Sequence, residues 1–287
     1  MRRGDFAAAW SISDAQLQRR SSVDQYNLPR HQQSVWDGRP VSGKRVLVRC
    51  YHGLGDTIQF IRYAPLLKRE AAEVIVWAQP SLIPLLRTVN GTDRLLPLHD
   101  GAPDVDYDVD LDVTELPYVF RTTLETIPAD VPYVHIEPAL RRVDERLRVG
   151  VIWQAGDWDE ARSIPFASIR RLARLDEIDW HILQRDAASA GWDGRFGRIA
   201  GGDNPLDDAR VMRSLDLVIS VDTMTAHLAG ALGQPVWTLL AVDADWRWLL
   251  NRNDSPWYPT MRLFRQREAG QWDSVIDEVA AELMRLL

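Results

Sequence analysis

The chain has 287 residues, of which 46% are hydrophobic and 26% charged, with a formal net charge of −7 and one cysteine. This composition excludes a disordered or membrane-embedded chain, and the negative charge argues against a surface that recruits nucleic acid. The lone Cys50 excludes an intrachain disulfide and a cysteine zinc cluster. With no secretory signal and no integral membrane segment in the sequence, these features predict a cytoplasmic protein.

The first half of the chain begins with residues 1–43, which predict a short helix and a polar linker broken by Pro29, Gly38 and Pro40. From residue 44 onward, short apolar strands alternate with helices. Strands are predicted at 46–48, 74–77, 94–98 and 109–111, and helices at 58–67 and 80–89. This series predicts an N-terminal Rossmann-like domain over residues 44–140.

A second alternating series follows a proline-containing connection at 128–138. Its predicted strands are at 149–153, 180–183, 217–220 and 235–240, its helices at 166–175, 207–215 and 228–232, and an amphipathic helix at 273–287 ends it. We therefore predict a C-terminal Rossmann-like domain over 141–272, and an α/β protein with two doubly wound parallel sheets. Ligands of such sheets bind beyond the carboxyl ends of the strands, so the polar turns at 52–56, 153–163 and 221–227 are expected to face one central cleft.

The segment 217–240 is the most informative, because it is typical of a strand, a polar turn, a helix and a second strand. The turn holds Asp222, Thr223, Thr225 and His227. Hydroxyl and amide groups at a helix N-terminus form an anion site that suits a nucleotide diphosphate, and Asp222 could cap the helix. The alternative is a capped crossover whose polar residues only complete the helix.

The turn at 52–57 follows the first strand and opens a helix, and its glycines allow a ligand to approach the backbone. It lacks the third glycine of a dinucleotide fingerprint. Asp56 is placed to accept a proton from a substrate hydroxyl. The alternative is an acid that only stabilises the helix N-terminus, by about 0.3–1 kcal/mol.

Three further segments have two interpretations each. Arg162 is predicted to bind phosphate oxygens, or to be a surface arginine. The aromatic stretch 245–259 either closes over a ligand or packs the two domains together. The acidic loop with Asp104, Asp106 and Asp108 is read as a solvated edge, and no metal site is predicted because no histidine completes the set.

Taken together, these residues resemble the heptosyltransferase-like glycosyltransferases of family 9. They resemble more closely the glycosyltransferase domains that follow tetratricopeptide repeats in bacterial proteins. The matching blocks are Trp-Asp-Gly-Arg-Pro at 36–40, Gly-Leu-Gly-Asp-Thr-Ile-Gln-Phe at 53–60, Arg-Ser-Ile-Pro at 162–165, Ser-Val-Asp-Thr at 220–223 with Ala-His-Leu-Ala at 226–229, and Asp-Trp-Arg-Trp at 245–248 with Ser-Pro-Trp-Tyr-Pro at 255–259. Residues 4–10 resemble the end of a repeat array, reduced to a remnant.

This resemblance implies a GT-B fold, in which two Rossmann-like domains face a cleft and the helix at 273–287 packs back on the N-terminal domain. It also implies inverting transfer from a nucleotide sugar to a glycan, lipid-linked or protein acceptor, with no metal or other cofactor. Asp56 then matches the catalytic base. The alternatives are a module that keeps the fold but only binds a nucleotide sugar or a partner, and a nucleotide-sugar epimerase.

The resemblance also implies a set of binding residues. The donor residues are Trp153, Gln154, Arg162, Gln184, Asp222, Thr223, Met224, Thr225 and His227, and the acceptor side is formed by His52, Gly53, Gly55 and Gln59. The chain departs from heptosyltransferases at two positions, with Arg162 in place of a lysine and Met224 in place of a glycine. The identity of the donor is therefore not carried over.

Overall fold

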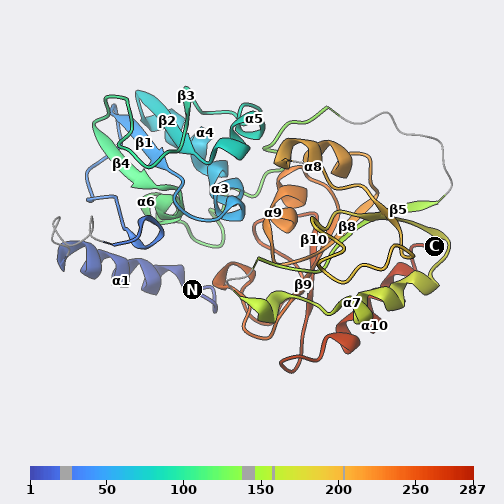
Figure 1. The fold of residues 1–287 in the computed structure, drawn as a ribbon. Helices are drawn as coiled ribbons and strands as arrows, with labels where there is room; N and C mark the ends of the chain where they lie inside the picture. The colour runs from blue at the N-terminus through green and yellow to red at the C-terminus, as the bar shows by residue number, and fades with distance from the viewer. Residues whose placement is uncertain (20–27, 138–145, 157–158, 203) are drawn as a thin grey trace. The chain divides into compact units, whose positions relative to one another are not determined.

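The computed structural model describes residues 1–19, 28–137, 146–156, 159–202 and 204–287. They form two compact units, one of Met1–Ala129 with Tyr133–His135 and one of Asp130–Pro132 with Ile136–Leu287 (Figure 1). The boundary expected between residues 140 and 141 lies outside the described residues.

The first unit is built on a parallel sheet in the order β3-β2-β1-β4. Its elements are α1 (Phe6–Arg19), η1 (Arg30–Gln32), β1 (Arg45–Arg49), α3 (Leu54–Phe60), η2 (Ile61–Tyr63), α4 (Ala64–Glu70), β2 (Glu73–Ala78), η3 (Pro80–Leu82), α5 (Ile83–Leu86), β3 (Arg94–Pro97), β4 (Val109–Asp112), η4 (Val113–Glu115) and α6 (Leu116–Val119). In β1, Val46 pairs with Val74 of β2 and Val109 of β4. These valines are fully buried, as expected for the apolar strands of a parallel sheet.

Helix α1, in the segment 1–43 that was expected to hold a helix and a linker, is part of this unit. Phe6 and Trp10 are buried. The Trp10 indole N–H donates to the Thr122 carbonyl at 2.7 Å, and its ring lies 5.6 Å from that of Tyr118. The helix packs here because two large aromatic side chains lie four positions apart, on one face.

The second unit contains a parallel sheet in the order β10-β9-β8-β5-β6-β7. Its elements are β5 (Leu147–Ile152), η5 (Glu160–Arg162), α7 (Phe166–Ile169), η6 (Arg170–Arg174), β6 (Ile178–Ile182), β7 (Arg198–Ile199), α8 (Pro205–Met212), β8 (Leu217–Val221), α9 (Met224–Ala231), β9 (Val236–Leu240), η7 (Trp246–Trp248), β10 (Met261–Arg265) and α10 (Trp272–Leu283). Strands β7 and β10 lie at the two edges and were not predicted from the sequence.

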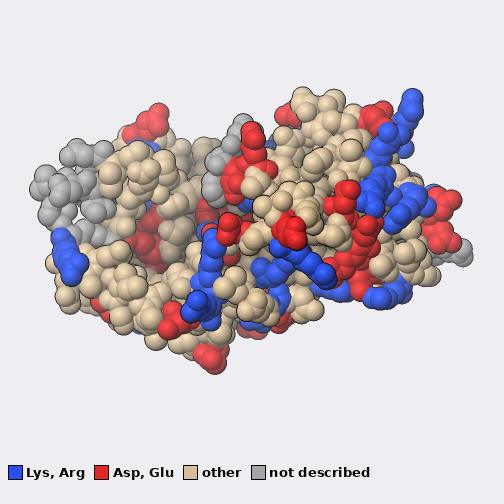
Figure 2. All heavy atoms as spheres, turned by 90° about the horizontal axis from the view of Figure 1, so that it is seen from below, with Lys and Arg blue, Asp and Glu red and all other residues tan. Residues whose placement is uncertain are grey.

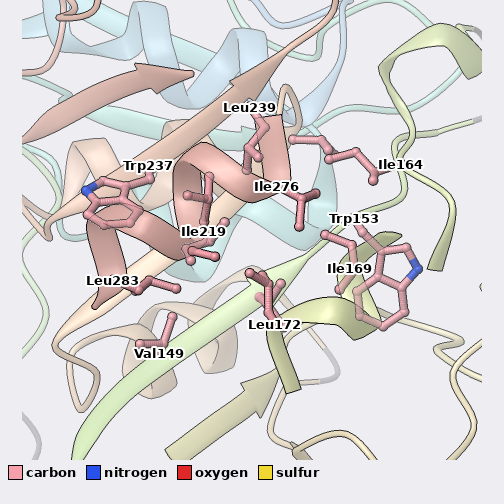
Figure 3. Packing of buried hydrophobic residues seen from close by; sticks show 14 of the residues in the cluster. Val149, Trp153, Ile164, Ile169, Leu172, Ile219, Trp237, Leu239, Ile276 and Leu283 are labelled. Carbon is pink, nitrogen blue, oxygen red and sulfur yellow. The ribbon is translucent and has the colours of Figure 1, made fainter. Parts of the chain in front are cut away.

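Helix α10 packs into the core of its own unit. Its side chains Val275, Ile276 and Leu283 are buried in one cluster with residues of β5, β8 and β9. Figure 3 shows Ile276 and Leu283 among Val149, Ile219 and Leu239 of these strands. The apolar face of α10 is thus covered within the second unit.

Charged side chains of both signs are intermixed on the surface. On the face in Figure 2, acidic and basic groups lie next to one another and no large basic patch forms. Arg171 of η6, for example, lies 2.5 Å from Asp277 and 3.2 Å from Asp273 of α10. None of the described helices has both the length and the apolarity that crossing a membrane requires.

Candidate functional site

The three polar turns follow strands at the points where each sheet reverses its strand order. In the first unit, β1 lies between β2 and β4, and the turn 52–56 follows β1. In the second unit, β5 lies between β6 and β8, and the segment 153–163 and the turn 222–227 follow β5 and β8. The carboxyl ends of strands at such a reversal are the usual ligand-binding positions of open α/β sheets.

The carboxylate of Asp56 lies at the N-terminus of α3. Its Oδ2 accepts a hydrogen bond from the Gly53 backbone N–H at 2.9 Å. The side chain is half-buried, and Gly53 is exposed. The contact expected of a helix-stabilising acid is therefore present, and it also fixes this carboxylate beside the peptide that joins His52 to Gly53.

Gln79, at the end of β2, ties the turn to α3. Its Nε2 donates to the His52 carbonyl at 2.7 Å, and its Oε1 accepts from the Thr57 hydroxyl at 3.0 Å. Both ends of the turn are thereby held by one amide side chain. This arrangement limits the motion of the residues between them.

Two of the expected acceptor-side residues are less open than predicted. Gly55 lies in the first turn of α3 and is half-buried. Gln59 is fully buried, and neither atom of its amide has a hydrogen-bond partner among the described residues. Helix α3 thus turns the Gln59 side chain into the interior of the first unit.

In the second unit, Gln184 fixes the segment that follows β5. Its Oε1 accepts hydrogen bonds from the backbone N–H groups of Trp153 at 3.2 Å and Gln154 at 2.9 Å. The Trp153 indole N–H donates to the Ala190 carbonyl at 2.9 Å, and its ring is a core side chain (Figure 3). Of these three, Gln154 alone is exposed. Gln184 and Trp153 thus shape the segment through its backbone and its packing.

Arg162 connects the β5 segment to the turn after β8. Its Nη1 donates to the Asp222 carbonyl at 2.8 Å, and its Nε lies 3.5 Å from Oδ2 of Asp159. With a side chain only 14% exposed, it is not the surface arginine of the alternative interpretation. The guanidinium is held directly before the first turn of α9.

Helix α9 begins at Met224, and its N-cap residue Thr223 forms no side-chain capping hydrogen bond. The expectation that Asp222 caps the helix is wrong. Asp222 is buried, and its Oδ1 lies 4.0 Å from Nε2 of His227. Burial raises the pKa of this carboxyl group above its ordinary value. Thr225 is also buried, whereas Thr223 and Met224 are half-buried.

His227 belongs to a buried aromatic cluster. Its Nδ1 lies 3.0 Å from the Tyr258 hydroxyl, and its ring stacks on Trp248 at 5.3 Å between centroids. Only 3% of the residue is exposed. His227 therefore supports the first turn of α9 by packing and hydrogen bonding, while its ring is taken up by the protein itself.

The stretch 245–259 packs around α9 within the second unit. Trp248, Trp257 and Tyr258 are fully buried. Gly230 of α9 makes room for Tyr258, because a Cβ at this position would lie 2.4 Å from a ring carbon. Trp248 and Tyr258 were not predicted as supports of the turn, although the aromatic content of the stretch indicated a packing role.

The acidic loop of the first unit forms ion pairs. The guanidinium of Arg45 bonds Asp108 and holds the pKa of that carboxyl down to about 2. Asp106 lies 3.9 Å from the same guanidinium. Within the described ranges, no three histidine, cysteine or acidic side chains gather in a way that could hold a metal ion.

Known proteins show which fold this is. No protein-family model matches the chain. It is 24% identical over 298 residues to Protein FlbA of Caulobacter vibrioides, covering 86% of this chain and 48% of that protein. The chain thus spans about half the length of this relative.

Three solved structures match the chain over most of their own length. A glycosyl transferase family 9 protein from Veillonella parvula DSM 2008 has a TM-score of 0.59 at 12% identity, covering 87% of this chain and 91% of its own. E. coli ADP-heptose lps heptosyltransferase II has a TM-score of 0.57 at 15% identity, and the match covers 84% of this chain and 99% of that structure's chain. E. coli heptosyltransferase WaaC with ADP has a TM-score of 0.55 at 14% identity, and the match covers 85% of this chain and 100% of that structure's chain. The predicted fold class is thereby confirmed: α/β, with two Rossmann-like parallel-sheet units as in GT-B heptosyltransferases.

Proposed function

We propose that this protein is an inverting glycosyltransferase that moves a sugar from a nucleotide-sugar donor to an acceptor hydroxyl, with no metal or other cofactor. The observation that carries the proposal is the first turn of α9, where the N-cap residue Thr223 forms no side-chain capping hydrogen bond and Arg162 donates to the adjacent Asp222 carbonyl. The fold shared with heptosyltransferases supports it.

The donor diphosphate is proposed to bind at this turn. The first amide N–H groups of a helix have no partner within it, and the helix dipole favours negative charge there. Arg162 adds a guanidinium charge at the same end, which would stabilise the leaving nucleoside diphosphate. In this proposal Gln184, Asp222 and His227 act by shaping the site, and Gln154, Met224 and Thr225 line it.

Asp56 is proposed as the general base. Its carboxylate accepts the proton of the acceptor hydroxyl while that oxygen attacks the anomeric carbon, and the bond from this carbon to the diphosphate breaks. Attack from the face opposite the leaving group inverts the anomeric configuration. The acceptor is proposed to be a glycan, a lipid-linked sugar or a protein. We also propose a cytoplasmic location, which suits the free buried Cys50, and an ancestry among repeat-associated transferases.

The test starts with donor binding. The melting temperature is measured with ADP, UDP, GDP and dTDP and with their sugar conjugates, because a ligand that binds only the folded state raises it. We expect one nucleotide class to raise it, and transfer with that donor to proceed unchanged in EDTA and to invert the anomeric centre. No shift with any nucleotide would contradict the proposal.

A second candidate is a binding module that keeps the fold without catalysis. The bond from the Gly53 N–H to Asp56 favours it, because this contact stabilises the N-terminus of α3 without any catalytic role. A melting shift with a nucleotide sugar, and no transfer to any acceptor offered, would distinguish this candidate from the enzyme.

A further inference from the structure

The proposed mechanism does not use residues 28–36, a segment of the first unit that we call the strap. Its N-terminal part holds Arg30, which bonds the loop after β3 and lies beside aromatic side chains at the ends of β2 and β1. Its C-terminal part bonds Glu115 of η4, directly after β4. In the order β3-β2-β1-β4, the strap thus contacts the carboxyl end of every strand. It lies on the side of the sheet where α/β proteins bind ligands.

The C-terminal part of the strap is firmly anchored. Glu115 Oε2 accepts hydrogen bonds from the backbone N–H groups of Val35 at 3.2 Å and Trp36 at 2.9 Å, and from that of Asp112 at 2.9 Å. The Trp36 side chain is buried, and its ring meets that of Tyr118 edge-on at 5.4 Å between centroids. One carboxylate and one buried indole therefore fix this part of the strap to the end of β4.

The N-terminal part of the strap is held by one side chain. Within the described chain, the hydrogen bonds and ring contacts that join residues 28–33 to other segments all come from Arg30. Its Nη1 donates to the His99 carbonyl at 2.6 Å, and its Nη2 donates to the carbonyls of Asp100 at 2.6 Å and Gly101 at 3.0 Å. Arg30 is therefore the latch of this part of the strap.

The latch rests on two aromatic rings that are held independently of the strap. The Arg30 Cζ lies 5.3 Å from the ring centroid of Tyr51 and 5.4 Å from that of Trp77, within the range of cation–π contacts. The Tyr51 hydroxyl accepts from Nη1 of Arg49 at 2.5 Å, and the Trp77 indole N–H donates to the Pro97 carbonyl at 2.9 Å. Because neither bond involves the strap, the rings can stay in place while the latch releases.

We propose that the strap is a lid over the acceptor side of the first unit, and that the Arg30 latch releases before the acceptor binds. Tyr51 immediately precedes the turn 52–57, so an acceptor that reaches this turn past the end of β1 meets the latched strap. Only molecules with an open strap then bind the acceptor, and the apparent KM rises by the reciprocal of their fraction. The inference rests on the proposed function and adds a conformational control to its acceptor step.

The movement of the strap is tested with a nitroxide attached to His31→Cys. His31 is exposed and the native Cys50 is fully buried, so the label reacts at position 31. Arg30→Ala should increase the mobile fraction of the label several-fold in the electron paramagnetic resonance spectrum. Arg39→Ala is the matched control, because Arg39 is exposed and pairs with its neighbour Asp37 at 2.6 Å. It should leave the spectrum unchanged. Equal melting temperatures of the two variants would show that the unit has not loosened as a whole.

Acceptor kinetics test the consequence of this movement. A panel of saccharides, lipid-linked sugars and peptides is offered with the donor that binds, and the acceptor that is used is titrated. Arg30→Ala should lower its KM roughly 3- to 10-fold, the effect of removing about one net hydrogen bond from the closed state. The Kd of the donor should stay within about twofold of wild type, because α9 lies in the other unit. Hydrolysis of the donor should keep its wild-type rate, since water is small enough to reach the turn past a closed strap.

Several results would overturn the inference. They are an unchanged label mobility in Arg30→Ala, an acceptor KM that stays the same or rises in this variant, and an equal change in acceptor transfer and donor hydrolysis. Transfer by Arg30→Ala alone would support the lid, whereas transfer by neither protein to any acceptor of the panel would overturn it. If no nucleotide sugar binds at all, the proposed function fails first and the lid fails with it, whatever the label shows about Arg30.

Discussion

The two polar turns present their chemistry in different ways. After β1, Asp56 and His52 are half-buried side chains, each bonded to a neighbour in its own unit. After β8, Asp222 and His227 are buried, and the Thr223 side chain does not cap the N-terminus of α9. The first turn is therefore suited to proton transfer, and the second to binding charge through peptide groups. Substitutions in the first turn should therefore change turnover, whereas substitutions in the second turn and its supports should change nucleotide affinity and stability.

The largest expected effect is that of Asp56→Asn on turnover. Losing the general base should lower kcat by about 10²- to 10⁴-fold, while the Kd for the nucleotide sugar stays the same because α9 lies in the other unit. Steady-state kinetics and calorimetric titration measure the two quantities. Asp108→Asn, in the same unit, is the control and should leave kcat unchanged. Wild-type turnover in Asp56→Asn would remove this residue as the base and favour a binding module.

Among the variants of the second unit, Gly230→Ala should lower stability and nucleotide affinity the most. The new Cβ would lie 2.4 Å from the Tyr258 ring, so the ring and the support of His227 must shift. Overpacking of this kind costs about 1–3 kcal/mol, more than alanine gains in a helix. We expect a lower melting temperature and weaker nucleotide binding.

The matched control for this variant is Gly156→Ala. A Cβ at Gly156 meets no atom within 4 Å, so it should leave the melting temperature unchanged. Equal melting temperatures for the two variants would show that Tyr258 adapts freely, and that the second turn is less rigid than its packing indicates.

The positions of the turns could be predicted from the sequence, because each follows an apolar strand and precedes a helix. Edge strand β10 was missed, since Met261–Arg265 alternates apolar and charged residues after a proline-rich loop and has no continuous apolar run. It could not be predicted either that the side chains of Asp222 and His227 point into the protein. Their neighbours Trp248 and Tyr258 come from a loop about 20–30 residues further along the chain, and no local pattern links them.

The position of Asp112 beside His52 was not predicted, for a related reason. The strand was predicted at 109–111, whereas β4 extends to Asp112, and nothing in this local sequence distinguishes Asp112 from the acidic residues of the preceding loop. Only the pairing of β1 with β4 brings it next to the turn that contains His52. Local sequence therefore located the candidate sites, whereas tertiary contacts decided which side chains face a ligand.

Tyr258→Phe should lower stability and nucleotide affinity less than Gly230→Ala does. Compared with a matched variant of the first unit, it should show which unit binds the nucleotide. Removing the hydroxyl leaves Nδ1 of buried His227 without this partner, at a cost of about 1–2 kcal/mol, and should weaken nucleotide binding a few-fold. Tyr63→Phe makes the same change in the first unit, where the hydroxyl bonds Thr122 at 2.8 Å. It should destabilise its own unit and leave nucleotide affinity unchanged. Equal effects of both variants on affinity would contradict the proposed division of roles.

The smallest expected effects are on the pH dependence of stability, and they have opposite signs in the two units. Arg45 lowers the pKa of Asp108 to about 2 from an ordinary 3.8, so its stabilisation is present above pH 4 and is lost as pH falls toward 2. Burial raises the pKa of Asp222, so the folded state retains that proton more tightly, and wild type loses stability as pH rises through the raised value. Between pH 3 and 7, the melting temperature of Asp108→Asn should fall progressively further below that of wild type, whereas the melting temperature of Asp222→Asn should rise relative to wild type. Calorimetric scans across this range measure both differences. If the two differences change in the same direction with pH, Asp222 is not a carboxylate destabilised by burial, and the expected contrast between the ion-paired Asp108 and the buried Asp222 is contradicted.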